Sequence, residues 1–351
     1  MKITRQTGGK TASGETIFLF HLINDSGAYV ALTNLGVTWV SAVMPAANGA
    51  LEDVLLGYED VQGYLSDPFY MGATIGRFAN RIANATFFIG NEAYELERNE
   101  GAHTNHGGFS GFHKKVWQWE EIASGIRFTL HSPDREGGYP GNLFVSVDYQ
   151  LDEENTLLIR HRGITDAPTC LNMTNHAYFN LNGSPTTGIA AHHLLIPATK
   201  IVETAPDFIP TGKFTKVGGT VFDFTFLHAI GDSLSAADER LIQNRGYNHC
   251  YVLKESVSPE MKPAARLVEP VSGRELVVET DLPGVLLYTA GYLEDSRIGK
   301  KGIPFALHTG ICLETQFFPD APNHPGFPSC RLNPGEVYDH QTRYCFRTVK
   351  D

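Results

Sequence analysis

Short runs in which hydrophobic and polar residues alternate recur along almost the whole chain. The clearest covers residues 144–151, where the odd positions are Val, Val, Tyr and Leu and the even positions between them are Ser, Asp and Gln. A period of two residues is typical of a β-strand with one face buried. Comparable runs rich in β-branched and aromatic residues cover residues 15–22, 28–35, 127–131, 156–162 and 275–280.

Helical patterns are few and short, and residues 236–243 provide the best of them. The 35 glycines and 19 prolines are spread through the length, so turns are frequent and no segment has the composition of a linker. There is no low-complexity segment and no repeat of fixed period. We therefore expect an all-β chain with few short helices, folded as a single domain of packed sheets over residues 1–351.

The charge balance narrows the range of partners. Lys and Arg number 28 against 39 Asp and Glu, which gives a net charge of −11. Nucleic acids and anionic membranes both favour basic surfaces, so neither is expected as a partner. The first residues contain no apolar run typical of a signal peptide, and no stretch is long enough to cross a bilayer. Five cysteines without C-x-x-C spacing fit free thiols in a reducing compartment, so we expect a cytoplasmic protein.

One polar and aromatic stretch near the middle of the chain, residues 172–182 (Asn-Met-Thr-Asn-His-Ala-Tyr-Phe-Asn-Leu-Asn), is a candidate for chemistry. Its Thr, Tyr and Phe residues favour a strand, on which His176, Tyr178 and Asn180 would share one face. Two interpretations are open at this point. The row is either a buried polar network or the wall of a site that presents a proton donor.

A second stretch places charge among small and apolar residues. Residues 72–83 include Arg77, Asn80 and Arg81. A buried guanidinium is costly unless its donors are paired, so each arginine either binds carbonyl or carboxylate oxygens inside the protein or lines a cleft. The structural role inside the protein is favoured for Arg77. It is less strongly favoured for Asn80 and Arg81, which could instead line a cleft.

Histidines supply two further candidates. His106 precedes two glycines, where the backbone can turn sharply and expose the ring to a ligand. His103 with His106, and His192 with His193, resemble partial metal sites, but neither pair has a convincing third ligand or a known ligand spacing. We therefore expect no metal.

An acidic residue completes the set. Glu314 follows an apolar run and precedes aromatic residues, so it is expected to be at least partly buried. A buried carboxylate is either paired, here with one of the arginines, or functional, as a base whose proton affinity is raised by burial.

These motifs, taken in order, resemble the aldose 1-epimerase (galactose mutarotase) family nearly end to end. The matching segments are residues 32–37, 52–58, 76–82, 106–108, 111–112 with Trp117, 138–141, 174–181, 209–212, 222–224, 313–316 and 334–340. The resemblance implies a large multi-stranded β-sandwich, called a supersandwich, with the sugar site in an open cleft on one sheet. It also implies an isomerase that interconverts α and β anomers of a free aldose such as galactose or glucose, without metal or cofactor.

The resemblance also implies roles for individual residues. Glu314 is expected to act as the base and His176 as the acid, with His106 near the ring oxygen. Asn80, Arg81 and Tyr178 are expected to contact the sugar. The roles of acid and base are each worth roughly a hundred- to ten-thousand-fold in rate.

The chain departs from the family pattern at three positions beside these residues. Asn248 and Leu286 stand where the family usually has Asp and Gln, and Asn105 stands where it usually has Leu. We include Asn248 and Leu286 among the expected substrate contacts, and they leave the preferred aldose open.

Several functions stay open on the residues alone. The substrate could be a pentose, a deoxy-sugar or a sugar phosphate in place of a free hexose. The chain could also be a glycosidase with paired carboxylates, although only Glu314 lies in a motif. The chain could, finally, be a sugar-binding or regulatory module without catalytic activity. In each case the chain is expected to be a monomer or a homodimer.

Overall fold

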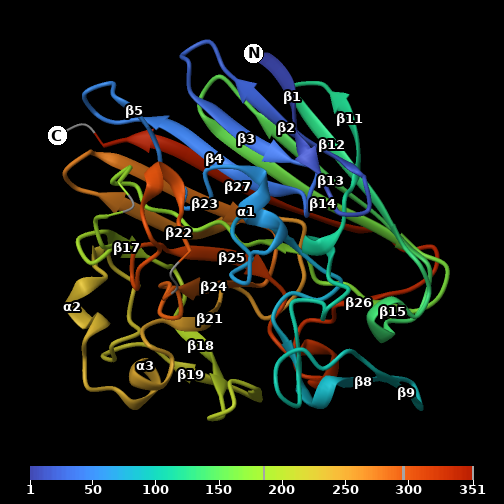
Figure 1. The fold of residues 1–351 in the computed structure, drawn as a ribbon. Helices are drawn as coiled ribbons and strands as arrows, with labels where there is room; N and C mark the ends of the chain where they lie inside the picture. Colours follow the sequence, from blue (N-terminus) through green and yellow to red (C-terminus); the bar gives the residue numbers. More distant parts are fainter. Residues whose placement is uncertain (185, 295–296, 350–351) are drawn as a thin grey trace.

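Three extended sheets carry most of the strands (Figure 1). The structure is a computed structural model that describes residues 1–184, 186–294 and 297–349. Neighbouring strands within these sheets are antiparallel. The largest sheet has nine strands, in the order β11 (Gln118–Ile122), β12 (Gly125–Ser132), β13 (Leu143–Leu151), β14 (Thr156–Thr165), β27 (Tyr338–Thr348), β23 (Arg274–Thr280), β22 (Lys262–Glu269), β17 (His193–Leu195) and β20 (His228–Ala229).

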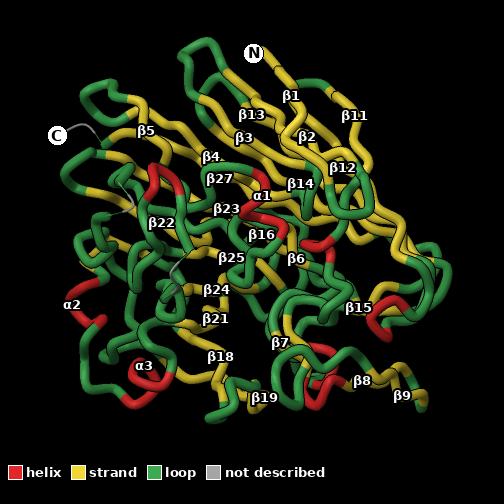
Figure 2. Tube along the Cα trace, viewed as in Figure 1, coloured by secondary structure: helices red, strands yellow, loops and turns green. Residues whose placement is uncertain are grey.

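The other two extended sheets have five strands each. The first is formed by the start of the chain, in the order β1 (Lys2–Lys10), β2 (Thr16–Ile23), β3 (Tyr29–Thr33), β4 (Thr38–Pro45) and β5 (Leu51–Asp53). The second has the order β19 (Pro210–Lys216), β18 (Lys200–Thr204), β21 (Asn248–Val252), β24 (Gly284–Tyr288) and β25 (Cys312–Gln316). Figure 2 shows the strands of this second sheet one below another.

The remaining strands form two-stranded pairs. The pairs are β6 (Thr74–Ile75) with β16 (Thr174–Asn175), β7 (Arg81–Ile82) with β10 (Thr104–Asn105), β8 (Thr86–Ile89) with β9 (Glu92–Glu95), and β15 (Thr169–Cys170) with β26 (Arg331–Leu332). The α-helices in the described part of the chain are α1 (Val61–Leu65), α2 (Gly231–Leu234) and α3 (Glu239–Gln243). Five single turns of 3-10 helix occur elsewhere in the described residues. The expected all-β class with few short helices is therefore confirmed.

The alternating pattern places side chains as expected. In β13 the odd-numbered residues are buried, which explains the period of two in residues 144–151. Asp148 is also buried, although it lies on the polar face of the strand. Arg127 on the neighbouring β12 donates two hydrogen bonds of 2.7 Å to its carboxylate, which offsets the cost of burial. The helical pattern of residues 236–243 is only half right, because α3 begins after Asp238, whose side chain accepts a hydrogen bond from the backbone N–H of Arg240.

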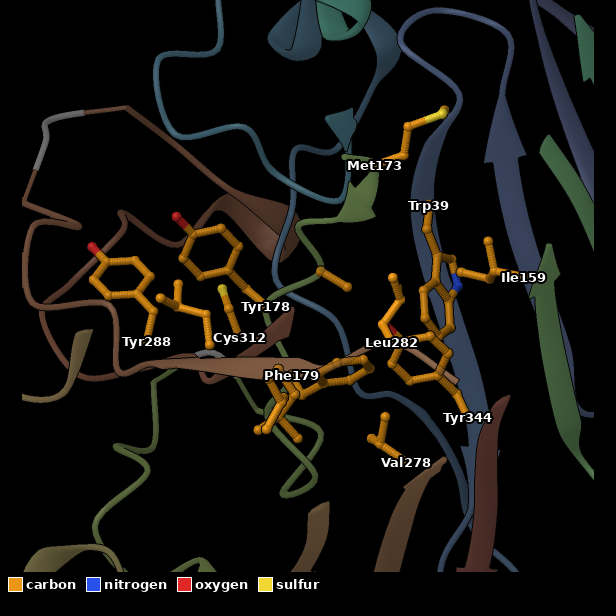
Figure 3. Close-up of a cluster of buried hydrophobic side chains, with 14 of the residues drawn as sticks. Trp39, Ile159, Met173, Tyr178, Phe179, Val278, Leu282, Tyr288, Cys312 and Tyr344 are labelled. Carbon is orange, nitrogen blue, oxygen red and sulfur yellow. The ribbon is translucent and has the colours of Figure 1, made fainter. Parts of the chain in front are cut away.

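The two five-stranded sheets pack against different strands of the nine-stranded sheet. The N-terminal sheet contacts it through β2 with β13 and β4 with β27, and the other sheet contacts it through β22 with β24. Phe179 joins the layers at the centre (Figure 3). Its ring lies 5.6 Å from those of Trp39 and Tyr344, while Tyr178 and Tyr288 lie on its other side. Aromatic contacts of this kind add to the stability from burial, so the central stretch is anchored in the core.

The long strand predicted for residues 172–182 is wrong, because only Thr174–Asn175 forms a strand. Asparagine side chains take the place of a sheet ladder there. Asn175 accepts a hydrogen bond of 3.0 Å from the N–H of Ala177, and Asn180 accepts one of 3.1 Å from the N–H of Asn182. Such local bonds favour turns over strands. His176 and Tyr178 still reach a common cleft, whereas Asn180 does not line it.

No helix in the described part of the chain combines the length and the apolar character needed to cross a bilayer.

Candidate active site

The floor of a cleft is formed by one face of β21, β24 and β25. The ladder register pairs Cys250 with Leu286 and Leu286 with Glu314. It likewise pairs Asn248 with Tyr288. Residues directly opposite each other point to the same face of a sheet, and so do residues two apart. The even-numbered residues of the three strands therefore share one face, and Asn248, Leu286, Tyr288 and Glu314 on that face line a cleft of about 260 Å³.

All of the expected site residues come together around this cleft. They arrive from separate parts of the chain: the β7 region, the loop after β10, the turn after β16, and the three floor strands. The residues are Asn80, Arg81, His106, His176, Tyr178, Asn248, Leu286 and Glu314. Asn105, noted in the sequence as a departure from the family pattern, also lines the cleft. The lining residues that the sequence did not reveal are Pro68, Phe69, Tyr70, Glu100, Phe208, Tyr288 and Tyr292.

Glu314 is a fully buried carboxyl group on β25, the outermost strand of the floor. Its Oε1 lies 3.5 Å from Nε2 of His176, and neither carboxyl oxygen has a hydrogen-bond partner among the described residues. Burial raises the pKa of Glu314 from 4.5 to about 8, and the positive charge of Arg81 opposes this shift only in part. The ion pair between Glu314 and a buried arginine, which the sequence left open, is not formed among the described residues.

His176 is the neighbour that shares the proton chemistry of Glu314. Burial lowers the pKa of His176 from 6.5 to about 4. Its Nδ1 lies 3.6 Å from Sγ of Cys312, a weak partner that leaves the imidazole without a charge on that side. At neutral pH the pair therefore holds one proton, which rests on Glu314 while His176 is neutral.

His106 is fixed by its own backbone and that of Asn80. The ring Nδ1 accepts a hydrogen bond of 3.2 Å from the backbone N–H of Asn80, and the N–H of His106 donates to the carbonyl of Asn80 at 3.2 Å. Burial, with the charges of His176, Arg81 and His113, holds the pKa of His106 well below its usual value. A neutral ring that accepts at Nδ1 carries its proton on Nε2, so His106 offers a donor there.

The glycine after His106 is required by the close approach of two segments. Gly107 has a φ of 83°, and a Cβ atom on it would lie 2.0 Å from the carbonyl oxygen of Gly76. A side chain would push this loop away from the segment that leads to Asn80. The His-Gly-Gly sequence therefore positions the imidazole as well as exposing it.

The two arginines of residues 72–83 have different environments. Arg77 is buried and donates to the carbonyl oxygens of Ser132, Pro133, Pro140 and Gly141, which confirms its expected internal role. Arg81 lines the cleft and binds Glu100, with Nε–Oε2 at 2.5 Å and Nη2–Oε1 at 2.9 Å. Its guanidinium also lies 5.2 Å from the centre of the Phe208 ring.

His106, His176 and Glu314 lie close enough together to be considered as metal ligands, since one atom from each falls within 4.8 Å of the others. The hydrogen bonding at His106 does not suit this role. A metal at Nε2 needs the proton at Nδ1, where it would point at the N–H of Asn80. The expectation of a site without a metal stays a prediction, and the tautomer of His106 supports it.

Comparison with known proteins identifies the relatives of this chain. The family model described as aldose 1-epimerase matches residues 19–345. The chain belongs to the aldose 1-epimerase family. It is 39% identical over 347 residues to galactose mutarotase of Mus musculus, covering 99% of each chain, and 34% identical to aldose 1-epimerase of Escherichia coli (strain K12), covering 97% of this chain and 98% of that one.

Solved structures agree with this assignment. An aldose epimerase homologue from C. elegans has a TM-score of 0.86 at 31% sequence identity, covering 94% of this chain and 98% of that chain. Galactose 1-epimerase from Lactobacillus acidophilus NCFM has a TM-score of 0.87 at 27% identity, covering 100% of both chains. The expected galactose mutarotase-like β-sandwich is therefore confirmed.

The three positions at which the sequence is expected to depart from the family pattern also line the cleft. Leu286 lies directly opposite Glu314, and Asn248 lies directly opposite Tyr288. Asn105 is buried at the other wall and donates a hydrogen bond of 3.4 Å to Glu100. The substitutions thus alter the surface that a substrate meets, not a distant part of the fold.

Sequence reasoning missed the aromatic wall and Glu100. The ring of Tyr70 lies 4.7 Å from that of His106 and 5.9 Å from that of His176. Tyr178, which was expected, donates its hydroxyl to the carbonyl of Phe69 at 2.9 Å. The aromatic pair before Met71 and the acid before Gly101 were visible in the sequence, but neither lies in an alternating pattern or a recognised motif.

Proposed function

We propose that this enzyme is a mutarotase for a free aldose, with Glu314 as the base and His176 as the acid. The observation that supports the assignment best is the 3.5 Å distance between the two side chains at the cleft. Their opposed pKa shifts leave one proton on the pair at neutral pH. One group must accept a proton and the other must give one for the ring of a sugar to open. A pair that holds a single proton meets this need.

The reaction proceeds by opening and reclosing the ring. Glu314 takes the proton of the anomeric hydroxyl as the C1 oxygen becomes a carbonyl oxygen. The bond between C1 and the ring oxygen breaks, and the ring oxygen takes a proton from His176. Rotation about the C1–C2 bond exposes the other carbonyl face, and the reverse steps close the ring as the opposite anomer. Protons and electrons balance without a cofactor.

The starting position of the proton needs one further step. In the free enzyme the proton rests on Glu314, because burial disfavours a charge on either group. A sugar brings hydroxyl groups that donate hydrogen bonds to the carboxylate, and these favour its ionised form. The proton can then pass to His176 over the 3.5 Å that separates the two atoms, without a change in the number of protons on the enzyme.

The other residues are proposed to hold the sugar. His106 donates from Nε2 toward the ring oxygen or its neighbouring hydroxyl and stabilises charge that develops there. Asn80 and Arg81 bind hydroxyl groups on the same side of the cleft, and Tyr178 accepts a hydrogen bond because its own proton is given to Phe69. Leu286, directly opposite Glu314, contacts the sugar beside the reacting groups, and Asn248 contacts it one strand farther away.

The charges of the cleft bear on a phosphorylated substrate and on glycoside hydrolysis. Arg81 is the only Lys or Arg among the described residues that line the cleft, and it is bound to Glu100. A sugar phosphate would find no unpaired cation there, so a phosphorylated substrate is not favoured. A glycosidase needs a second carboxyl group free to act, whereas both oxygens of Glu100 are held by Arg81.

Polarimetry tests the proposed function. Freshly dissolved α-anomers of galactose, glucose, xylose, arabinose and fucose are followed in buffer with and without the protein. We expect faster relaxation to the anomeric equilibrium for at least one of them. If no sugar relaxes faster than in buffer, the proposal is wrong.

Several broader features belong to the same proposal. We propose that residues 1–351 act as one domain, without nucleic acid or membrane partners, as a monomer or homodimer in the cytoplasm. The five cysteines, which are all buried free thiols, support a reducing compartment. The acidic net charge of −11 supports the absence of polyanionic partners.

A further inference from the structure

Glu100 lies beside the reacting groups but has no part in the proposed proton transfers. It belongs to the short segment before β10 and is held there by two backbone hydrogen bonds with His103, of 3.2 Å and 2.9 Å. Its side chain is 40% exposed and lines the cleft. Asn105 donates a hydrogen bond of 3.4 Å to the same carboxylate. The backbone and a neighbouring side chain therefore fix the position of this acid.

The carboxylate of Glu100 binds the side of the Arg81 guanidinium. Arg81 is the one Lys or Arg among the described residues that line the cleft. Oε2 accepts from Nε of Arg81 and Oε1 accepts from Nη2, so the two planar groups meet along a shared edge. The central carbon of the guanidinium lies over the ring of Phe208, 5.2 Å from the ring centre. Arg81 is only 13% exposed, so little water reaches it. Its charge is thus compensated from within the protein before any substrate arrives.

The pairing of Arg81 with Glu100 disfavours substrates with a negative charge. An anionic group that enters the cleft leaves water and meets no uncompensated cation among the described lining residues, while Glu100 repels it. A neutral hydroxyl group meets no such penalty. It can use the donors of Arg81 that do not face Glu100.

We propose that Glu100 is a specificity-determining residue that restricts the cleft to uncharged aldoses by neutralising Arg81. This assignment rests on the proposed mutarotase function and adds a substrate class to it. Removing the charge of Glu100, without changing its size, frees a cation in the wall of the cleft. The enzyme then accepts aldoses that carry a carboxylate or phosphate group.

The experiment compares Glu100→Gln with two matched variants. Glu100→Asp keeps the negative charge, and Glu121→Gln makes the same change of net charge on β11, at an exposed position outside the cleft. For each protein, kcat/KM for mutarotation is measured with galactose, glucose, galacturonate, glucuronate and glucose 6-phosphate. The informative quantity is the ratio of each anionic sugar to its neutral parent.

We expect Glu100→Gln to raise at least one of these ratios by about tenfold, as a freed charge contributes in a partly buried site. Glu100→Asp and Glu121→Gln should stay within about twofold of the wild type. Ratios in Glu100→Gln that match those in Glu121→Gln would overturn the assignment. So would an equal rise in Glu100→Asp, because that result would mean a loosened wall and not a freed charge.

The dependence on salt gives a test that needs no variant to fold. Raising the ionic strength screens attraction and repulsion alike. In the wild type, the ratio for anionic sugars should stay level or rise with salt, because repulsion is screened. A fall would mean that a free cation attracts them and would overturn the proposal. If the wild type accelerates no neutral aldose, both this assignment and the mutarotase function fail, whereas failure of the ratios alone leaves the function intact.

Discussion

Nε2 of His176 and Oε1 of Glu314 lie 3.5 Å apart in the floor of the cleft, and burial moves their pKa values in opposite directions. The carboxyl group becomes a weaker acid than usual, and the imidazole becomes a weaker base. Between the two values the pair holds one proton. Opposed shifts of this kind are typical of acid–base pairs in active sites.

A bell-shaped pH dependence of kcat/KM follows from the single shared proton. Below about pH 4 both groups are protonated and no base remains. Above about pH 8 the pair loses its proton and no acid remains. We expect a plateau between these limits, which belong to the pair and not to either residue. Initial rates corrected for the buffer reaction at each pH measure the profile, and activity that keeps rising beyond pH 9 would contradict it.

Glu314→Gln should abolish mutarotation and leave sugar binding largely intact. The amide keeps the shape of the side chain and still accepts hydrogen bonds, but it takes no proton at neutral pH. Polarimetry measures the loss, and calorimetry or intrinsic fluorescence measures binding. If the purified variant keeps more than a small fraction of the wild-type rate, Glu314 is not the base.

The same substitution should stabilise the fold in alkaline solution. The folded protein binds the Glu314 proton up to about pH 8, whereas the unfolded chain loses it near the usual value of 4.5. The wild type therefore loses stability as the pH rises through this window, and glutamine removes the loss. We expect Glu314→Gln to melt at about the same temperature as wild type near pH 4.5. At pH 9 it should be more stable by a few kcal/mol, on the order of what such a shift supplies.

Thermal melts at several pH values test this expectation, with Glu121→Gln as a control of equal charge change at an exposed position. A stabilisation that is the same at pH 4.5 and pH 9 would mean that the glutamine packs better. It would not then reflect the titration of a buried carboxyl group.

His176 and His106 should respond differently to substitution by asparagine. His176→Asn removes the proposed acid and should lower kcat most. His106→Asn should also raise KM, because the ring of His106 is held by Asn80 in a form that donates to the sugar. Steady-state kinetics with one sugar separates the two effects. Losses confined to KM in both variants would contradict the assignment of the acid.

Much of the fold was predictable because each strand carries its own signal. The alternation in residues 144–151 records the burial of one face of β13, and that relationship is local. The error at residues 172–182 arises instead from contacts with distant segments of the chain. Thr, Tyr and Phe favour a strand there, but side chains such as that of Asn180 bind the backbone of other loops, including the carbonyl of Thr309. Propensity could not foresee those distant partners.

The site was predictable only where motifs repeated a family pattern. Glu314, His176 and His106 lie in such motifs, and the structure brings them together. Glu100 does not, because its significance arises from contact with Arg81 through a turn that alternation does not describe. Tyr70 was not predicted as a site residue for the same reason. A residue that lines a cleft from an irregular loop leaves no period in the sequence.

The last prediction concerns the preferred sugar and rests on Leu286 and Asn248. Leu286 faces Glu314 across one ladder, so its side chain lies beside the reacting end of the cleft and is buried. It offers no hydrogen bond. A hydroxyl group pressed against it would lose water without compensation, at a cost of roughly 1–3 kcal/mol.

Asn248 has a different effect from Leu286. Its amide both accepts and donates, and it grips a hydroxyl group less strongly than a charged carboxylate does. Together the two residues should weaken the use of galactose. A pentose, a deoxy-sugar or another epimer, which carries a hydrogen or methyl group against Leu286, should be used relatively better.

The double variant Asn248→Asp, Leu286→Gln restores a charged acceptor and a second polar group at positions that line the cleft. We expect it to raise kcat/KM for galactose relative to xylose, arabinose and fucose by about ten- to a hundredfold, as a recovered buried hydrogen bond supplies. Leu286→Met is the matched control, since it changes shape but adds no strong hydrogen bond, and it should leave the ranking of the sugars as it is.

The opposing view is that water satisfies any hydroxyl group of the sugar at these two positions. Leu286 argues against that view, because it is only 5% exposed and its side chain cannot hold water by a hydrogen bond. If the wild type already prefers galactose and the double variant keeps the same ranking, the two substitutions are neutral and the specificity has another origin.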